Sequence, residues 1–216
     1  YTSNNIRNIA VLGHGGKGKT TLCEAMLYIA GASDRLGRVA DGNTVLDFDS
    51  EEKRRKSSVS SAIAALEWDN TKLNIIDAPG LFDFEGGAAE AVRAAEAVLI
   101  VTSAGSGVDV GTEKAFRAAE KKGAAKFFAV TKTDSDHRNF YKTFDALKEV
   151  YGNKLCPTII PYMEGNITKC YVNLMTGMAF SYDENGKATK VPVPEDSVIE
   201  EMTSAFMEAV ATTDDA

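Results

Sequence analysis

The sequence contains few cysteines, prolines and tryptophans. The scarcity of cysteine argues against disulfide-rich and zinc-binding proteins. It has 3 cysteines, 5 prolines and 1 tryptophan among 216 residues. The cysteines are odd in number, widely spaced and match no zinc-ligand pattern, so neither a disulfide framework nor a zinc module is indicated. They are Cys23, Cys156 and Cys170. Such thiols suit a reducing compartment, and we expect a cytoplasmic protein.

Positive charge and long apolar runs are also scarce. The chain has 24 Lys and Arg against 31 Asp and Glu, a net charge of -7, which argues against broad electrostatic binding of nucleic acid. We therefore expect no sequence-specific nucleic-acid partner. No run approaches the roughly 18 apolar residues of a membrane span, and residues 1–8 lack the apolar core of a signal peptide, so no membrane partner is expected. The chain begins at Tyr1 rather than Met, and we expect a fragment of a longer protein that is monomeric in isolation.

Apolar runs of strand length alternate with segments of helical period along most of the chain. This alternation predicts an α/β fold with a mostly parallel sheet and helices on both faces. Ser58–Trp68 and Lys72–Ile76 are expected to form a hairpin, and Thr158–Tyr162 the last strand of the core sheet. The polar stretch Asp34–Lys56 shows no persistent period and is interpreted as a loop.

A glycine-rich loop stands between the first apolar strand and the first helix. It fits G-x-x-x-x-G-K-[ST] at every fixed position, the pattern of a phosphate-binding loop. Glycines let backbone N–H groups turn toward phosphate oxygens, and the helix that follows directs its positive dipole end at the same anion. We expect Lys19 to act catalytically by neutralising the β- and γ-phosphates, and the Thr20 hydroxyl to ligate Mg²⁺. The nucleotide-binding residues predicted here are Gly13, His14, Gly15, Gly16, Lys17, Gly18, Lys19, Thr20 and Thr21.

A second motif, Asp77-Ala78-Pro79-Gly80, follows the apolar strand Leu73–Ile76. A carboxylate at the tip of that strand can hold a water on Mg²⁺, and a glycine after it can offer its N–H to the γ-phosphate. We therefore predict Asp77 as a metal-site residue and Gly80 as a catalytic residue. The whole stretch 77–81, including Leu81, is assigned to the nucleotide site.

A third motif, Thr131-Lys132-Thr133-Asp134, closes the strand Phe127–Val130 and fits [NT]-K-x-D. A carboxylate at Asp134 can accept hydrogen bonds from both N1–H and the exocyclic amine of guanine, whereas adenine offers no such donor pair. The stem of Lys132 can lie along the face of the base. The ligands predicted from the three motifs are GTP and GDP with Mg²⁺.

The run from Asn8 to Tyr162 resembles the G domain of elongation factor G, and in particular its elongation-factor-G-like relatives. His14 and the Thr20-Thr21 pair match the family's A-H-x-D-x-G-K-T loop, and residues 73–80 are similar to its R-I-N-I-I-D-T-P-G. The tail from Pro157 through the final helix resembles the insertion carried inside that G domain. The resemblance implies a P-loop GTPase fold over 1–162, a partial α+β insertion over 163–216, and the ribosome as partner of the full-length protein.

Aligning the family's R-G-I-T-I-T-S-A back from Trp68 puts Ser58 at the threonine that ligates Mg²⁺ in that family. Three departures accompany the resemblance. The family's loop aspartate is Gly16 here, and its [ST]-A-[KL] guanine motif is not found after Asp134. Where the family has the histidine that positions the attacking water, this chain has Leu81, which neither donates nor accepts a hydrogen bond.

Three hypotheses about function follow. The leading one is a GTPase domain that binds and hydrolyses GTP to switch a ribosome-associated factor, with turnover slowed by Leu81. The second is a nucleotide-dependent interaction module with little or no hydrolysis. The third is a partition-type P-loop ATPase, because His14 to Thr21 also resembles the deviant loop of that group, although His14 stands where that group has a signature lysine.

Overall fold

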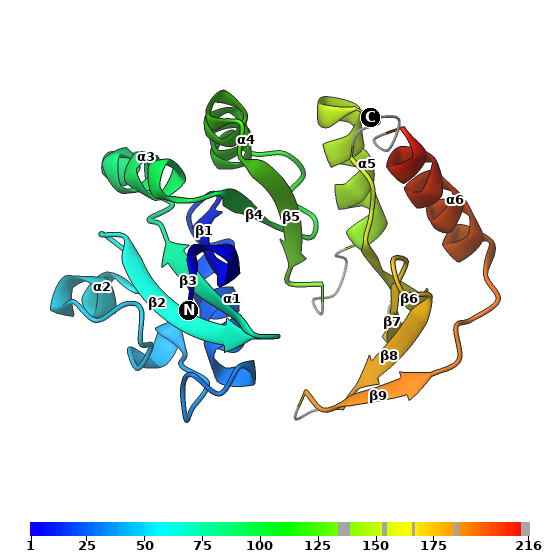
Figure 1. The fold of residues 1–216 in the computed structure, drawn as a ribbon, viewed down its shortest axis with the longest axis horizontal. Helices are drawn as coiled ribbons and strands as arrows, with labels where there is room; N and C mark the ends of the chain where they lie inside the picture. The colour runs from blue at the N-terminus through cyan, green and yellow to red at the C-terminus, as the bar shows by residue number, and fades with distance from the viewer. Residues whose placement is uncertain (134–138, 153–154, 166, 184–185, 213–216) are drawn as a thin grey trace. The chain divides into compact units, whose positions relative to one another are not determined.

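The fold comes from a computed structural model, and the structure describes residues 1–133, 139–152, 155–165, 167–183 and 186–212. The chain forms two compact units, Tyr1–Lys132 and Thr133–Ala216, each drawn in Figure 1. In the described residues, no helix is both long and apolar enough to cross a membrane.

The first unit is built on a five-stranded sheet in the order β2-β3-β1-β4-β5. Its strands are β1 (Ile6–Leu12), β2 (Ala62–Trp68), β3 (Thr71–Asp77), β4 (Ala97–Ser103) and β5 (Ala125–Thr131). Only β2 runs antiparallel to its neighbour, while β1, β3, β4 and β5 are mutually parallel. The carboxyl ends of the four parallel strands therefore meet at one edge, where α/β sheets hold their ligands.

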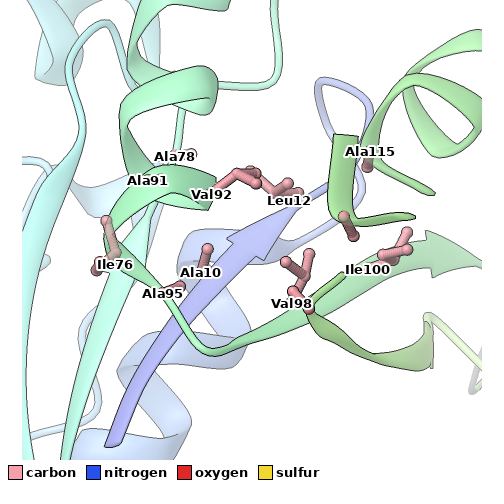
Figure 2. Packing of buried hydrophobic residues seen from close by; sticks show 12 residues of the cluster. Ala10, Leu12, Ile76, Ala78, Ala91, Val92, Ala95, Val98, Ile100 and Ala115 are labelled. Atoms are coloured by element: carbon pink, nitrogen blue, oxygen red, sulfur yellow. The ribbon is translucent and has the colours of Figure 1, made fainter. Parts of the chain in front are cut away.

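Helices cover both faces of this sheet (Figure 1), as the alternating pattern predicted. They are α1 (Lys19–Ile29), α3 (Glu85–Ala94) and α4 (Val110–Lys122). Successive residues of β1 serve opposite faces, because side chains alternate along a strand. Ala10 and Leu12 join the cluster under α3 and α4, whose side chains Figure 2 shows gathered together, whereas Val11 joins the cluster under α1 with Cys23 and Leu27.

The predicted hairpin is confirmed, since β2 and β3 pair antiparallel from Ala62↔Asp77 to Trp68↔Thr71. Asp69 and Asn70 form its turn with φ of 46° and 57°, the left-handed pair that two-residue hairpin turns require.

The interpretation of Asp34–Lys56 as one irregular loop is wrong in part. It contains a single 3-10 turn, η2 (Val39–Asp41), and a short helix, α2 (Ser50–Arg55). Asp49 caps α2 by accepting from the Glu51 amide, and Glu52 completes a capping box. Acidic residues in the first turn and basic residues in the last further stabilise so short a helix. In the sequence, α2 is therefore indicated by its capping residues and by the placement of its charges, and not by an apolar period.

The second unit contains α5 (Phe140–Tyr151), α6 (Ser197–Ala211) and a four-stranded antiparallel sheet in the order β6-β7-β8-β9. The strands are β6 (Ile159–Glu164), β7 (Ile167–Asn173), β8 (Met178–Tyr182) and β9 (Ala188–Val191). Its core includes Ile160, Val172, Ala179 and Ile199.

The assignment of Thr158–Tyr162 to the parallel core sheet is wrong, because β6 pairs antiparallel with β7. A short apolar run specifies a buried strand and leaves its partner open. The division into domains over 1–162 and 163–216 stays a prediction.

Candidate functional site

The glycine-rich loop joins the end of β1 at Leu12 to the start of α1 at Lys19, as predicted. Gly13 shows why the loop needs glycine. Its φ is 138°, and a Cβ there would overlap the carbonyl oxygen of Val101 in β4. Gly18 leads directly into α1 with a left-handed φ of 89°. The loop backbone therefore packs tightly against β4 and leads directly into the N-terminus of α1.

Lys19 lies buried inside this loop. Its ammonium donates to the carbonyl oxygens of Gly13 at 3.1 Å and His14 at 3.2 Å. Burial lowers the pKa of Lys19, and the nearby Asp77 carboxylate opposes that shift. A cation held this way is already desolvated, so it can transfer its hydrogen bonds to an anion with little reorganisation.

Thr20, Ser58 and Asp77 meet in a buried polar cluster, although they come from α1, the segment before β2 and the end of β3. The Thr20 hydroxyl donates to Asp77 Oδ2 at 2.6 Å and lies 3.2 Å from Ser58 Oγ. Ser58 in turn donates to Asp47 Oδ1 at 2.7 Å. The three residues predicted for the metal site are thus brought together, with Asp47 as a fourth member.

This cluster fits a hard divalent cation. Its donors are hydroxyl and carboxylate oxygens, the ligands Mg²⁺ prefers. Asp77 is 1% exposed, and burial raises its pKa to about 7. Asp77 Oδ1 and Asp47 Oδ2 are buried without a hydrogen-bond partner in the described structure. Among the described residues, no three His, Cys, Asp or Glu side chains converge to hold a metal by themselves. A Mg²⁺ ion here would need water or ligand oxygens to complete its coordination.

Sequence reasoning missed Asp47. It lies in a polar stretch with several other acids, and nothing in the local pattern separates it from Asp49. Only its burial does so, since Asp47 is buried while Asp49 serves as a helix cap.

Gly80 turns the chain over the loop at the end of β3. A Cβ on Gly80 would overlap the Lys19 ammonium and come within 2.8 Å of the Gly15 amide nitrogen. Leu81, 39% exposed, packs over the loop, because its Cδ2 lies 3.0 Å from the position of a Cβ on Gly15. An apolar side chain therefore stands beside the loop where the resembled family has histidine.

The remaining side chains of the loop are tied to neighbouring strands and loops. Lys17 pairs with Asp109 at 3.1 Å and donates to Ser106 Oγ at 2.8 Å. His14 packs edge-on against Phe82, with ring centroids 5.5 Å apart. Gly16, which replaces the family's aspartate, is exposed with a left-handed φ of 74°. These contacts hold the loop in shape from both sides.

The third motif reaches the loop from the end of β5. Thr131 Oγ1 donates to the Lys17 carbonyl at 2.6 Å. Lys132, in a left-handed conformation with φ 56°, donates from Nζ to the Gly16 carbonyl at 2.7 Å. Asp134, the residue predicted to select guanine, lies outside the described residues. The other predicted positions are Thr21, exposed on α1, Ala78 and Pro79, buried after β3, and Thr133, half-buried after β5.

These features define the class of P-loop nucleotide-binding proteins. They are a mostly parallel sheet, a glycine loop leading into α1, a buried lysine, and an acid at the tip of the adjacent strand. Residues 4–213 match the family described as the elongation factor Tu GTP binding domain. The chain belongs to this family of GTP-binding GTPase domains. This membership decides against the partition-type ATPase.

Known relatives agree with the family. The chain is 34% identical over 206 residues to an elongation factor G-like protein of Mycobacterium tuberculosis strain H37Rv, covering 95% of this chain and 28% of that protein. It is 30% identical over 215 residues to elongation factor G of Mycoplasma genitalium, covering 98% and 31%. A solved structure from Thermus thermophilus superposes with a TM-score of 0.91 at 35% identity, covering 97% of this chain and 32% of that one. The chain thus spans about three tenths of the length of the relatives it matches.

Proposed function

We propose that this chain is the switching domain of an elongation factor G-like GTPase, which binds GTP and GDP with Mg²⁺ and hydrolyses GTP. In the full-length, cytoplasmic protein, the nucleotide state would control association with the ribosome. The observation that carries the proposal is the convergence of Lys19, Thr20 and Gly80 at one edge of the sheet. Lys19 and Thr20 begin α1 and Gly80 follows β3, and their convergence supports a shared role in binding a triphosphate.

Each residue would have a distinct part in binding and hydrolysis. The Lys19 ammonium would exchange the Gly13 and His14 carbonyls for phosphate oxygens. Thr20 and Ser58 would ligate Mg²⁺ through their hydroxyls, and Asp77 would hold a water on it. Bound Mg²⁺ would neutralise charge on the β- and γ-phosphates. The Gly80 N–H would donate to the γ-phosphate, and phosphoryl transfer of this kind depends mainly on such positioning and charge neutralisation.

One observation favours the second hypothesis, a nucleotide-dependent interaction module with little hydrolysis. Leu81 packs against Gly15 and cannot orient a water molecule. The two proposals differ in whether the bound GTP is cleaved, and in whether a partner accelerates that cleavage. Single-turnover GTP cleavage by the full-length protein, with and without ribosomes, separates them.

Base selectivity provides the test that comes first. We expect GTP and GDP to displace a fluorescent guanine nucleotide from this chain, and ATP to compete poorly. Asp134→Asn should weaken guanine selectivity, because an amide cannot accept from both guanine donors. Asp69→Asn, an exposed turn residue where asparagine is well tolerated, is the matched control. Equal competition by ATP and GTP in the wild type would contradict the proposed function.

A further inference from the structure

Glu24 is a fully buried carboxylate that the nucleotide site does not use. It lies on α1, one turn after Thr20, and is 0% exposed. Its Oε1 accepts hydrogen bonds from two successive backbone amides, Val45 at 2.7 Å and Leu46 at 3.1 Å. Burying a carboxylate is costly unless it is hydrogen-bonded. If this position of α1 served only to fill the core, an apolar side chain would fill it at lower cost.

The backbone that Glu24 holds belongs to the segment 45–60, which contributes Asp47 and Ser58 to the proposed metal site. Leu46 is buried against the α1 face of the sheet, and the next residue, Asp47, accepts from Ser58 Oγ. Ser58 lies 3.2 Å from the Thr20 hydroxyl. Residues four apart on a helix lie on the same face. Thr20 and Glu24 therefore lie on the same face of α1, one turn apart, with Glu24 hydrogen-bonded to the Val45–Leu46 backbone and Thr20 beside Ser58.

Gly37 shows how closely the Glu24 carboxylate is enclosed. A Cβ on Gly37 would overlap Glu24 Oε2 and lie 2.9 Å from the Thr44 Cα. Oε2 itself is buried with no hydrogen-bond partner in the described structure. Oε1 thus holds the Val45 and Leu46 amides, whereas Oε2 only fills the space beside Gly37.

A second carboxylate fixes the far end of the same segment. Glu52 on α2 is buried, and its Oε1 accepts from the amides of Val59 and Ser60 at 3.0 and 3.1 Å. These residues directly follow Ser58. Ser58 is thus held from both sides, by Glu52 through the backbone after it and by Glu24 through the Leu46–Asp47 backbone.

We infer that Glu24 is a positioning residue, which fixes the Asp47–Ser58 pair against Thr20 and so sets the geometry of the Mg²⁺ end of the nucleotide site. The inference rests on the proposed function for its metal-dependent part. The hydrogen bonds of Glu24 come from the Val45 and Leu46 amides, so it would act on the proposed site through that backbone and not as a ligand. Groups that orient metal ligands in this way commonly change metal affinity by about 10- to 100-fold when removed.

Two substitutions of Glu24 separate positioning from simple filling of space. Glu24→Gln keeps an accepting oxygen at Oε1, so it should retain both amide hydrogen bonds, although its amide nitrogen, buried without an acceptor, should lower overall stability. Glu24→Met keeps the approximate volume and loses the acceptor. Glu120→Met, the same chemical change on the exposed surface of α4, is the matched control.

Amide hydrogen exchange tests the attachment itself without nucleotide. The Val45 and Leu46 amides should exchange much faster in Glu24→Met than in the wild type, and Glu24→Gln should restore protection. If Glu24→Met fails to fold, Glu24→Leu takes its place, because it also removes the acceptor with a smaller apolar side chain. Unchanged protection at both amides in the folded variants would overturn the inference.

Nucleotide titration in Mg²⁺ and in EDTA tests the consequence. We expect the gain in GTP affinity on adding Mg²⁺ to fall about 10-fold in Glu24→Met, with affinity in EDTA unchanged and with Glu24→Gln close to the wild type. An equal loss in Mg²⁺ and EDTA would assign Glu24 a purely structural role and overturn the inference. If no variant, including the wild type, binds guanine nucleotide, the proposed function fails, while the exchange experiment still decides whether Glu24 holds the segment.

Discussion

Gly80 and Lys19 approach so closely that a side-chain carbon on Gly80 would overlap the Lys19 ammonium nitrogen. The two residues come from the turn after β3 and the first turn of α1. In the proposed function, the Gly80 N–H donates a hydrogen bond to the γ-phosphate and the Lys19 ammonium neutralises its charge. Their proximity therefore brings both groups to the same phosphate.

This proximity predicts the effect of a single methyl group. Gly80→Ala should displace Lys19 from the Gly13 and His14 carbonyls and weaken GTP binding by at least about tenfold, the equivalent of one charge-assisted hydrogen bond. Fluorescent-nucleotide titration measures the effect. Gly86→Ala is the control, since a Cβ there meets no atom within 4 Å. Equal affinities for both variants would contradict the placement of Gly80 in the site.

Removing the Lys19 side chain should abolish most nucleotide affinity and leave the fold intact. Lys19→Ala would leave the polyphosphate without its buried cation, which we expect to cost at least about tenfold in affinity. The circular dichroism spectrum should be unchanged. Lys121→Ala, an exposed lysine in the last turn of α4, should bind normally. A Lys19→Ala protein that folds and binds GTP as tightly as the wild type would refute the assignment.

The buried Asp77 should make the nucleotide-free protein less stable as the pH rises. Burial raises its folded-state pKa to about 7 from an ordinary value of 3.8, so the folded protein holds a proton that the unfolded chain releases. The stability supplied by that proton is complete below about pH 4 and is lost progressively up to about pH 7.

Asp77→Asn should remove this pH dependence, because an asparagine oxygen can still accept from Thr20 and carries no charge. At about pH 8 we expect the variant to melt a few degrees above the wild type, since about 1 kcal/mol shifts Tm by roughly 2–4 °C in a chain of this size. Thermal melts at about pH 4.5 and about pH 8 in EDTA measure it, across the window that the raised pKa defines. A wild-type melting temperature that rises relative to Asp77→Asn between these pH values would show the opposite sign and exclude a raised pKa.

Leu81→His should raise GTP turnover only in the presence of an activating partner. Alone, the new imidazole would sample several rotamers and position no water. With ribosomes and the full-length protein, a positioned water could be worth on the order of 100-fold. Leu81→Met preserves the apolar contact over Gly15 and is the control. If the wild type already hydrolyses GTP briskly with ribosomes and Leu81→His leaves that rate unchanged, another group positions the water.

The phosphate loop, the alternation of strands and helices, and the β2–β3 hairpin could be predicted from sequence, because each depends on contacts between near neighbours in the chain. Gly13 to Thr20 carries its glycines, lysine and hydroxyl at fixed local spacing, and the loop falls where strand and helix meet. Asp77 and Thr131 were identifiable for the same reason, since each ends an apolar run.

Tertiary structure decided what depends on distant segments. Asp47, Glu24 and Glu52 look like ordinary polar residues of a helix or loop, and only packing buries their carboxylates and gives each its hydrogen-bond donors. The sequence likewise did not determine which strand pairs with β6, because its apolar residues could be buried in either sheet. Local geometry and the order of elements follow from the sequence, whereas the cost of burying charge, and hence the role of a buried acid, is set only when the whole domain closes around it.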